Sequence, residues 1–496
     1  MSNKSPSIFE KKFLELVSRI KEIGLSFLEI EESLAWGELY GRLLSQNFSY
    51  LYRDGDFEKA LIKRYLSNNE IIRRETKPRE LHVISEAYGA GGHTRLMERL
   101  VSFREEVSDV VVVRATGDAR SLLKCSARVK ILSSEQGFNL DELVEIVSSY
   151  ETVFMHIHPD DLLSAVAIGI SKVISSNFVV FVNHADHVFS FGFEHADVVA
   201  EVSHFGYGID NEFRQTVSTY LGIPLNIKSI KKVPGFLASS KLKIFSAGSR
   251  LKYKPAAIAG SFQKILFKIL TDIDTAEVTV VGPSIFQDWW WWNLKLRYPD
   301  RVKIIQSLPH AEYVNELNSA NLYLDSFPMT GGTALPEARS KNIPVAGMAS
   351  GSSGYTPLDV LKYKSIDDLV HDLIGMANGT STSIENKNND PDIIRSLLYW
   401  HAFESVADRL NSLVKREFTP MPSEGGSDVD FDFYRRDWIS RGEVSFCLSD
   451  IKFLLRYRWK GLKIALAIVF GFGLKNFTSI FLKSLIKIIR RATILN

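Results

Sequence analysis

Two series of short apolar, β-branched runs fill the middle of the sequence and constrain the fold more than any other feature. The first begins at Leu81 and reads LHVIS, DVVVVRA, VKIL, TVFMHI, NFVVFVN and ADVVAEVS. The second begins near residue 242 and reads LKIFSAG, AEVTVVG, RVKII, ANLYLD and NIPVAG. Runs of this kind, separated by amphipathic helical segments, are typical of parallel strands covered on both faces by crossover helices. They predict an α/β chain with two successive doubly wound, Rossmann-like domains.

The flanking segments have other patterns, and 496 residues suggest about three domains. Residues 7–75 have helical periodicity, and 417–447 are rich in Gly, Ser and Pro, as linkers are. We therefore expect an N-terminal helical region (1–77), two Rossmann-like domains (78–235 and 236–416), a linker (417–447) and a basic amphipathic tail (448–496).

The tail combines cationic charge with apolar side chains. Residues 451–496 contain ten Lys or Arg and no Asp or Glu. The apolar run IALAIVFGFGL is eleven residues long, whereas about 20 are needed to span a bilayer. A last helix would place Phe477, Phe481, Leu485 and Ile488 opposite Lys483, Lys487 and Arg490. We expect residues 451–496 to lie on an anionic membrane surface. The alternative is a tail packed on the second domain.

Charge and cysteine content exclude several other classes of protein. Lys and Arg number 60 against 58 Asp and Glu, so no overall field favours nucleic acid as a partner. The two cysteines, Cys125 and Cys447, have no histidine at metal-ligand spacing, which argues against a disulfide framework or a zinc site. The N-terminus lacks the features of a signal peptide. We expect a cytoplasmic protein, peripheral on the inner face of the membrane.

Glycines follow one strand in each series. In the first, EAYGAGGHTRL places Gly89, Gly91 and Gly92 before a helix that starts near His93. The spacing matches neither the dinucleotide fingerprint nor the P-loop, so a loop without a ligand remains an alternative. In the second, Gly331, Gly332 and Thr333 separate the strand NLYLD from the helix ALPEARSKN. Backbone N–H groups at such a junction suit phosphate.

The second series carries a family resemblance. The segments LKIFSAGSRLKYKP, VTVVGPS and SLPHAEYVNELNSANLYLDSFPMTGGTALPEARSKNIPVAG resemble the donor-binding half of GT-B glycosyltransferases, in particular the O-linked N-acetylglucosamine transferase type and related bacterial enzymes. The resemblance covers about 242–347 and is faint over 80–210. It implies two domains facing a cleft, a nucleoside-diphosphate sugar on the second domain, an acceptor on the first, and inversion at the sugar.

The resemblance also implies roles for individual residues. Gly331, Gly332, Thr333 and Ala334 correspond to the pyrophosphate-binding segment, and Glu337 to the acid that binds ribose. Lys254 resembles the basic residue that neutralises the diphosphate leaving group, with Arg250 as a competitor for that role. The glycines Gly91 and Gly92 would be a further phosphate loop. Many relatives have His-Thr-Thr or Thr-Thr where this chain has Gly332, Thr333 and Ala334, so one hydroxyl contact is missing. No metal ion or cofactor is expected, and no Asp-x-Asp follows a strand.

Histidines at strand ends of the first series are candidates for the base that deprotonates the acceptor. They are His93, His156, His158, His184 and His187. A histidine beside a carboxylate can titrate near neutrality in a fixed orientation. We therefore rank His187 first, with Asp186 as its orienting acid, then His184 and His93. A structural role is the alternative for each of them.

The acceptor is inferred from the tail, which suggests a lipid-linked bacterial surface glycan of the lipopolysaccharide O-antigen or capsule type. Three alternatives remain: a protein glycosyltransferase, a nucleotide-sugar epimerase and a glycan-binding protein without activity. The run Trp289–Trp292 covers the whole circumference of a helix, so some of these rings should be exposed.

Overall fold

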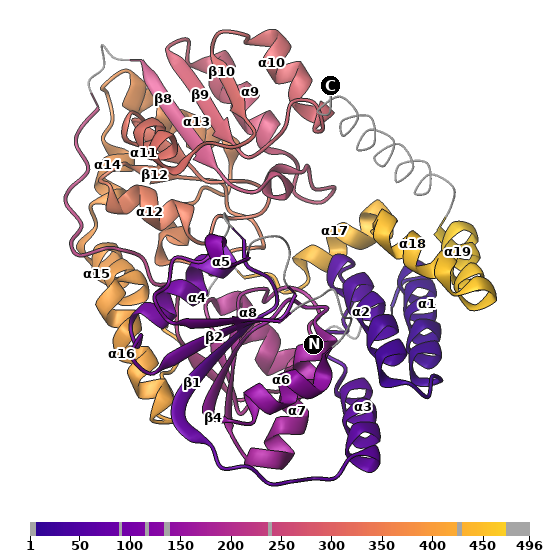
Figure 1. The fold of residues 1–496 in the computed structure, drawn as a ribbon. Coiled ribbons are helices and arrows are strands. Elements are labelled where there is room, and N and C mark those ends of the chain that lie inside the picture. The colour runs from indigo at the N-terminus through magenta and orange to yellow at the C-terminus, as the bar shows by residue number, and fades with distance from the viewer. Residues whose placement is uncertain are drawn as a thin grey trace, which may run out of the picture. The chain divides into compact units, whose positions relative to one another are not determined.

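The structure, a computed structural model, describes residues 6–88, 92–114, 119–132, 139–236, 241–423 and 429–472 (Figure 1). The described chain divides into two compact units. The first comprises residues within 1–200, 209–217 and 434–496, and the second comprises 201–208 and 218–433. The chain therefore leaves the first unit, builds the second, and returns to the first.

The first 201 residues form three helices and then alternate between strands and helices. These elements are α1 (Ile8–Leu25), α2 (Ile30–Gln46), α3 (Gly55–Asn68), β1 (Lys77–Ile84), α4 (Gly92–Ser102), β2 (Ser108–Val112), α5 (Ala119–Leu122), β3 (Arg128–Ile131), α6 (Leu140–Val147), β4 (Tyr150–His156), α7 (Leu162–Ser175), β5 (Phe178–Asn183) and β6 (Val198–Glu201). The chain then passes through α8 (His204–Ile209), the π-helix η2 (Asp210–Arg214) and β7 (Ser218–Tyr220).

The seven-stranded sheet, whose strands β1 to β5 belong to the first unit, has the Rossmann strand order. Its neighbours run β3-β2-β1-β4-β5-β6-β7, and the pairings among β1 to β5 are parallel. Successive side chains point to opposite faces, so Leu81 and Val83 of β1 join the core under α6 and α7, whereas Ile84 joins the core under α4 and α5. Strand order reverses between β1 and β4, which is the position where doubly wound sheets bind ligands.

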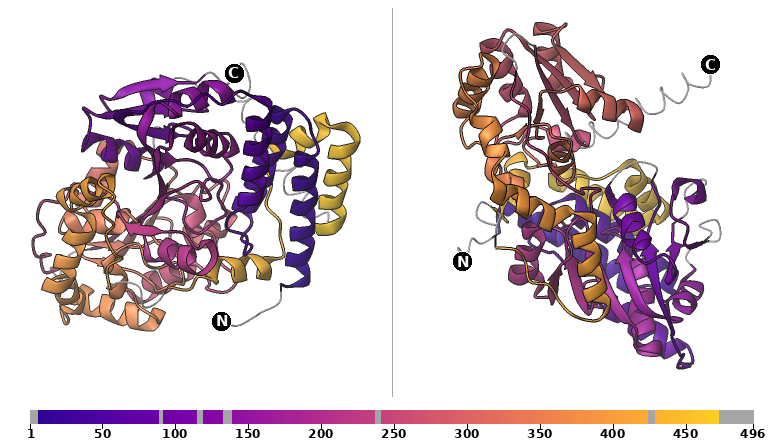
Figure 2. Two further views of the ribbon diagram at one scale, coloured as in Figure 1. Left: turned by 90° about the horizontal axis from the view of Figure 1, so that it is seen from below. Right: turned by 90° about the vertical axis from the view of Figure 1, so that its left-hand side faces the viewer.

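The C-terminal helices complete the first unit. They are α17 (Phe433–Arg441), α18 (Leu448–Arg456) and α19 (Arg458–Phe472), and Figure 2 shows these yellow helices beside the indigo N-terminal ones. The ring of Trp438 lies 4.9 Å from that of Phe9, and Leu454 and Ile464 are buried in the same core as α1 and α2. A Cβ at Gly461 would lie 1.7 Å from the carbonyl oxygen of Leu454, so only glycine allows α18 and α19 to approach so closely.

The second unit repeats the same topology with shorter strands. Its main elements are β8 (Leu242–Ala247), η3 (Arg250–Tyr253), α9 (Phe262–Asp272), β9 (Ala276–Val281), η4 (Trp289–Trp291), α10 (Trp292–Arg297), β10 (Val302–Ile305), α11 (His310–Asn318), β11 (Leu322–Leu324), α12 (Ala334–Ser340), β12 (Val345–Ala346), η5 (Pro357–Leu361), α13 (Ile366–Ala377), α14 (Ser383–Asn388), α15 (Pro391–His401) and α16 (Phe403–Val414). The strand order is β10-β9-β8-β11-β12, with parallel pairing throughout, so the reversal lies between β8 and β11.

The predicted fold class of two Rossmann-like domains is confirmed by these sheets. Helices α15 and α16 are separated at Ala402, where the His401 carbonyl accepts the N–H of Leu225 (2.8 Å). One local prediction differs from the structure. Within the predicted linker 417–447, residues Phe433–Arg441 form α17, since Trp438 and Arg435 are buried against α1.

Candidate functional site

The loops that follow β8 and β11 are joined to each other at the strand reversal of the second unit. Because β8 and β11 are neighbours, with Tyr323 opposite Phe245, both loops start at the same sheet edge. The Lys252 ammonium donates to the Thr330 carbonyl (2.7 Å), and the Tyr323 hydroxyl donates to the Ala247 carbonyl (2.9 Å). The two segments singled out in the sequence are thus held as one surface.

Asp325, at the end of β11, shapes the glycine loop. Its carboxylate accepts the N–H groups of Ser326 (2.9 Å) and Gly331 (3.0 Å). A Cβ at Gly331 would lie only 2.8 Å from the Asp325 Oδ1, which explains the glycine. Asp325 also pairs with the buried ammonium of Lys362 (2.8 Å), a residue that the sequence did not point to.

Beyond Gly331, the loop presents groups without protein partners. Within the described residues, the N–H groups of Gly332, Thr333 and Ala334 donate to no protein acceptor, and the Thr333 hydroxyl and Glu337 carboxylate also make no hydrogen bond. Glu337 lies one turn along α12, because its N–H donates to the Thr333 carbonyl (3.0 Å). Gly332 to Glu337 therefore form a short polar surface with unused donors and one acid.

The basic residues of the β8 loop differ in what they contact. Arg250 donates through Nε and Nη2 to the buried carboxylate of Asp288, at distances of 2.6 to 3.2 Å. Lys254, at the end of η3, is half-buried. Lys252, which was not predicted, reaches the glycine loop through the Thr330 carbonyl. The alternation of basic residues at 250, 252 and 254 is the signal that could have identified it, since all three lie in one tight turn.

A third loop, after β12, also reaches the glycine loop and was missed in the sequence. The Thr330 hydroxyl donates to the Ser352 carbonyl (2.8 Å), and the ring of Tyr355 would be 3.4 Å from a Cβ at Gly332. Asp359 accepts the N–H of Gly354 (2.7 Å). The run MASGSSGYTP, glycine- and serine-rich directly after a predicted strand, carries the same signal as the loops that were recognised.

In the first unit, three of the predicted histidines come together at the ends of β1, β4 and β5. The His93 ring is 4.1 Å from that of His184 and 5.1 Å from that of His158. The His93 Nε2 lies 2.9 Å from the His156 carbonyl oxygen. His156 itself is fully buried in β4, with its Nε2 3.0 Å from the His82 Nδ1, and so is enclosed within the sheet.

Burial controls the protonation of these rings. Burial, with the nearby His158, lowers the pKa of His93 to about 4, and burial holds the pKa of His184 well below its usual value. Both imidazoles are therefore neutral at pH 7 and are weak proton acceptors. Of the other two glycine-loop residues predicted here, Gly92 begins α4 and a Cβ on it would meet nothing within 4 Å, whereas Gly91 lies outside the described residues.

His187 and Asp186 form a separate pair. The His187 Nδ1 lies 3.1 Å from the Asp186 Oδ1, the carboxylate is buried, and the imidazole is 25% exposed. Its ring lies 4.7 Å from that of Tyr434. The buried guanidinium of Arg214 donates to the Asp186 carbonyl (3.0 Å), which fixes the backbone of this loop. An orienting acid on Nδ1 leaves Nε2 as the proton acceptor.

Acidic side chains gather at the same edge of the first sheet. Asp161 caps α7 by accepting the Ser164 N–H (3.0 Å), as expected of an acid at a helix start. The Arg114 guanidinium pairs with Asp160 (3.2 Å) and with Glu38 from α2 (2.7 Å). Burial raises the pKa of Glu38 to about 7, although Arg114 opposes the shift. Glu38 was missed because it lies in the N-terminal helices, far from the strand-end motifs.

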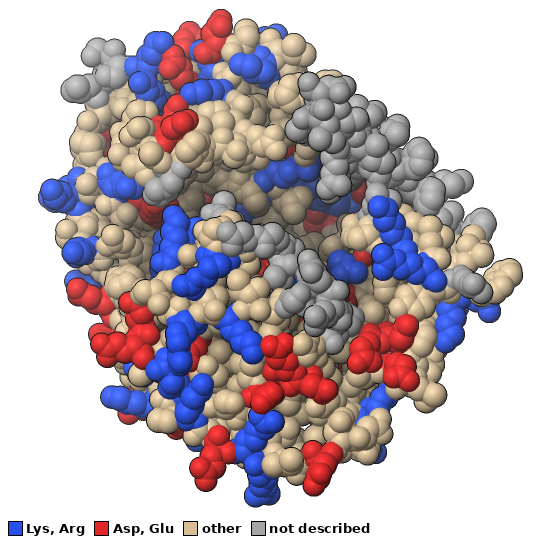
Figure 3. All heavy atoms as spheres, viewed as in Figure 1, with Lys and Arg blue, Asp and Glu red and all other residues tan. Residues whose placement is uncertain are grey.

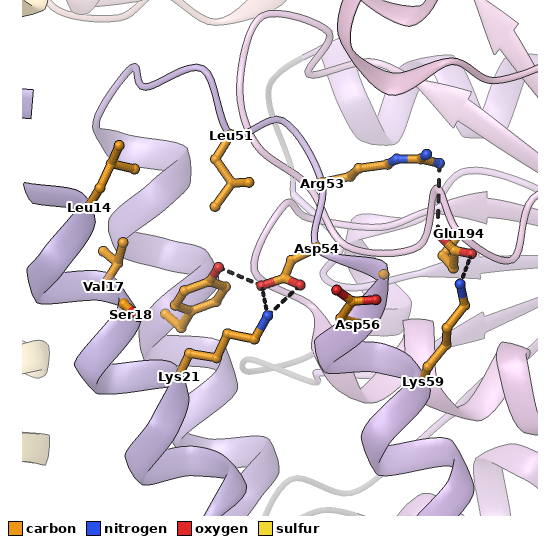
Figure 4. A pocket seen from close by; sticks show the side chains of 12 residues that line it. Leu14, Val17, Ser18, Lys21, Leu51, Arg53, Asp54, Asp56, Lys59 and Glu194 are labelled. Atoms are coloured by element: carbon orange, nitrogen blue, oxygen red, sulfur yellow. Dashed lines mark hydrogen bonds and ion pairs between the residues drawn. The ribbon is translucent and has the colours of Figure 1, made fainter. Parts of the chain in front are cut away.

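A cavity of about 590 Å³ lies elsewhere in the first unit, between α1 and α3 (Figure 4). None of the predicted site residues lines it. Several of its polar side chains are bonded to one another: Asp54 accepts from Lys21 (2.7 Å) and from the Tyr40 hydroxyl (2.6 Å), and Lys59 pairs with Glu194 (2.6 Å). The described residues also contain no group of three His, Cys, Asp or Glu side chains able to hold a metal ion.

The four successive tryptophans differ in exposure, because side chains around a helical turn point in different directions. Trp291 is fully buried, Trp290 is half-buried, and Trp289 and Trp292 are 70% and 52% exposed. The exposed side chains of Trp289, Trp292 and Phe286 therefore form an apolar patch around η4 and α10.

Comparisons with known proteins bear on the fold. The sequence matches no protein-family model, and the curated proteins gave no significant match. Solved structures do match. HepE of Anabaena, in complex with UDP, has 12% sequence identity and a TM-score of 0.52, over 68% of this chain and 100% of that chain. A glycosyltransferase of Rickettsia africae ESF-5 has 10% identity and a TM-score of 0.51, over 68% and 98%.

A structure of TarM gives a similar result, with 9% identity and a TM-score of 0.53 over 68% of this chain and 99% of that chain. At these identities the likeness concerns the fold. The chain shares with these proteins a fold of two Rossmann-like domains, the GT-B fold that the sequence resemblance implied.

Proposed function

We propose that this chain is a glycosyltransferase that moves a sugar from a nucleoside-diphosphate sugar to a hydroxyl acceptor. The observation that carries the proposal is the polar surface of the second unit, where Gly332, Thr333 and Ala334 present N–H groups without protein partners at the strand reversal. HepE, which has this fold, is described in complex with UDP, with UDP-glucose, and with UDP and glucose.

In this proposal the second unit binds the donor. The N–H groups of Gly332, Thr333 and Ala334 and the Thr333 hydroxyl hold the diphosphate, and Glu337 accepts hydrogen bonds from the ribose hydroxyls. Lys254 supplies the countercharge for the departing diphosphate. Arg250, whose guanidinium donates to Asp288, is the competing candidate.

The first unit supplies the base. As the bond between the anomeric carbon and the diphosphate oxygen breaks, the acceptor oxygen bonds to that carbon and gives its proton to the Nε2 of His187. The Asp186 carboxylate stabilises the imidazolium that results. Attack opposite to the leaving group inverts the sugar. We propose that no metal ion is needed, since backbone N–H groups and Lys254 can stabilise the leaving group.

The acceptor is proposed to be a lipid-linked bacterial surface glycan, of the lipopolysaccharide O-antigen or capsule type, reached from the cytoplasmic face of the membrane. Support comes from the ten basic and no acidic residues of 451–496, which favour an anionic lipid surface. No helix within the described residues is long and apolar enough to cross a bilayer.

A thermal-shift screen of the full chain against nucleoside diphosphates and their sugars tests the proposal. A ligand at 100 times its Kd should stabilise the folded state by about 2.7 kcal/mol, and the matching sugar nucleotide should do the same. If none of them raises Tm, the proposal fails. NMR of the products with a bound sugar nucleotide then separates transfer from epimerisation, and binding without turnover over many acceptors would indicate a glycan-binding protein.

A further inference from the structure

The helix pair α18–α19 has two apolar faces, and only one of them is used inside the protein. Leu454, Ile464 and Ile468 are buried against the N-terminal helices. The opposite face carries the membrane stripe, which we define as Leu455, Trp459, Leu462 and Leu466, with 60%, 75%, 36% and 43% of their surfaces exposed. A helix that faces water should be polar on its outer side, so this stripe needs a partner.

Basic side chains flank the stripe. Lys452, Arg456, Lys460 and Lys463 are exposed on the same two helices. The one acid of the pair, Asp450, is buried and bound to Arg42 (2.6 Å), so it does not offset them. Figure 3 shows blue and tan atoms over α18 and α19, at the right of the view. An apolar row that includes tryptophan, bordered by cations, fits the boundary between acyl chains and anionic headgroups.

We propose that the membrane stripe inserts into the headgroup region of an anionic bilayer and holds the first unit on it. This rests on the membrane association proposed above and specifies its surface. It also differs from a peptide tail that binds lipid by itself, because the buried face of α19 belongs to the core of the first unit. The acceptor-binding unit is thereby fixed to the membrane by folded structure, as a lipid-linked acceptor requires.

Point substitutions in the full chain test this surface better than truncation, which would remove Leu454 and Ile464 from the core. The probe is vesicles of equal parts phosphatidylglycerol and phosphatidylcholine, with pure phosphatidylcholine vesicles for comparison. We expect Trp459→Ala to weaken sedimentation with the anionic vesicles roughly tenfold, and Lys452→Gln with Lys463→Gln to weaken it about fivefold per lysine. High salt should weaken the binding of the wild type to anionic vesicles, because it screens the charges of the basic side chains. It should not weaken the contribution of the apolar side chains.

The matched control is Trp289→Ala, which removes an equally exposed tryptophan from the second unit. It should leave vesicle binding unchanged. Equal binding of wild type and Trp459→Ala would overturn the proposal, as would a change from dimer to monomer in Trp459→Ala without lipid, which would make the stripe an interface between copies. The Tm shift caused by UDP, measured on the same proteins, separates the membrane proposal from the proposed function. A wild type that binds anionic vesicles but shows no Tm shift with UDP would contradict the donor site alone.

Discussion

The Lys362 ammonium lies 2.8 Å from the Asp325 carboxylate and 2.5 Å from that of Asp359, and all three side chains are at least 94% buried. Asp325 accepts from the glycine loop at Gly331, and Asp359 accepts from the loop after β12 at Gly354. One buried charge therefore positions two of the loops that border the candidate donor surface. Although burial lowers it, the two acids hold the pKa of Lys362 above its usual value.

Lys362→Met should destabilise the second unit, because it leaves two buried carboxylates without a countercharge. Removing one partner of a buried ion pair costs about 3–5 kcal/mol. Chemical unfolding of the full chain measures the loss. Lys364→Met, two residues away and exposed, is the control and should change stability by less than about 0.5 kcal/mol. A similar small effect for Lys362→Met would mean that the loops are held by other contacts.

Thr333→Val with Glu337→Ala should weaken binding of the nucleoside diphosphate found in the thermal-shift screen. Losing a hydroxyl and a carboxylate contact should cost about 2–4 kcal/mol, or roughly 30- to 1,000-fold in Kd. Isothermal calorimetry provides the measurement. The control is Glu312→Gln on α11, an exposed acid outside the loop. Unchanged affinity in the double variant would remove Gly332 to Glu337 as the donor site.

His187→Ala should lower kcat by about 10²- to 10⁴-fold and leave the Kd of the donor unchanged, since a general base acts only in the transfer step. His371→Ala, an exposed histidine of α13, is the control. His184→Ala is the competing variant, and its neutral ring predicts a smaller loss. The reverse order of effects would assign the base to the stacked histidines instead.

Glu38→Gln should flatten the pH dependence of stability in the neutral range. Because burial raises the pKa of Glu38 to about 7, the folded state binds a proton there that the unfolded chain releases near pH 4.5. Wild-type stability should therefore fall by roughly 1–3 kcal/mol as pH rises from about 4.5 to 7 through this group. The free energy of unfolding at several pH values, compared with Glu312→Gln, shows the difference; parallel curves would contradict the raised pKa.

Glu10 and Arg435 provide a double-mutant test of the contact between the N-terminal and C-terminal helices of the first unit. Arg435 donates to Glu10 at 2.6 and 2.8 Å with both groups buried, and this contact links α1 to α17. Arg435→Met should cost about 3–5 kcal/mol, and adding Glu10→Leu should recover part of it. If the two single effects simply add, the pair does not couple the two ends of the chain.

Strand positions could be predicted from the sequence because each apolar run specifies its own local structure. The sequence also placed His93, His158 and His184 at strand ends, but that these three rings meet was not predicted; they do so because β1, β4 and β5 are consecutive in the sheet. Their burial was not visible, and it makes His93 a weaker base than its position suggested.

Long-range partners account for what the sequence could not show. Arg435 and Glu10 are 425 residues apart, and nothing near Arg435 in the sequence distinguishes a buried helix from a linker. In the same way, Arg250 donates to Asp288, which lies 38 residues away in the sequence. In the sequence Lys362 looks like a surface lysine, and its ion pairs with Asp325 and Asp359 are visible only in the structure. The last predicted helix, with Phe477 and Lys483, lies outside the described residues.

The return of the chain to its first unit sets an order for folding during synthesis. Helices α1 and α2 are made early, but the core that covers Phe9 and Trp36 includes Trp438, Phe453 and Tyr457. A ribosome adding about 5–20 residues per second needs roughly 20 seconds or more to reach those residues. The N-terminal helices must wait, with apolar surface open, while the second unit can already fold. The part of the molecule made first is thus completed last.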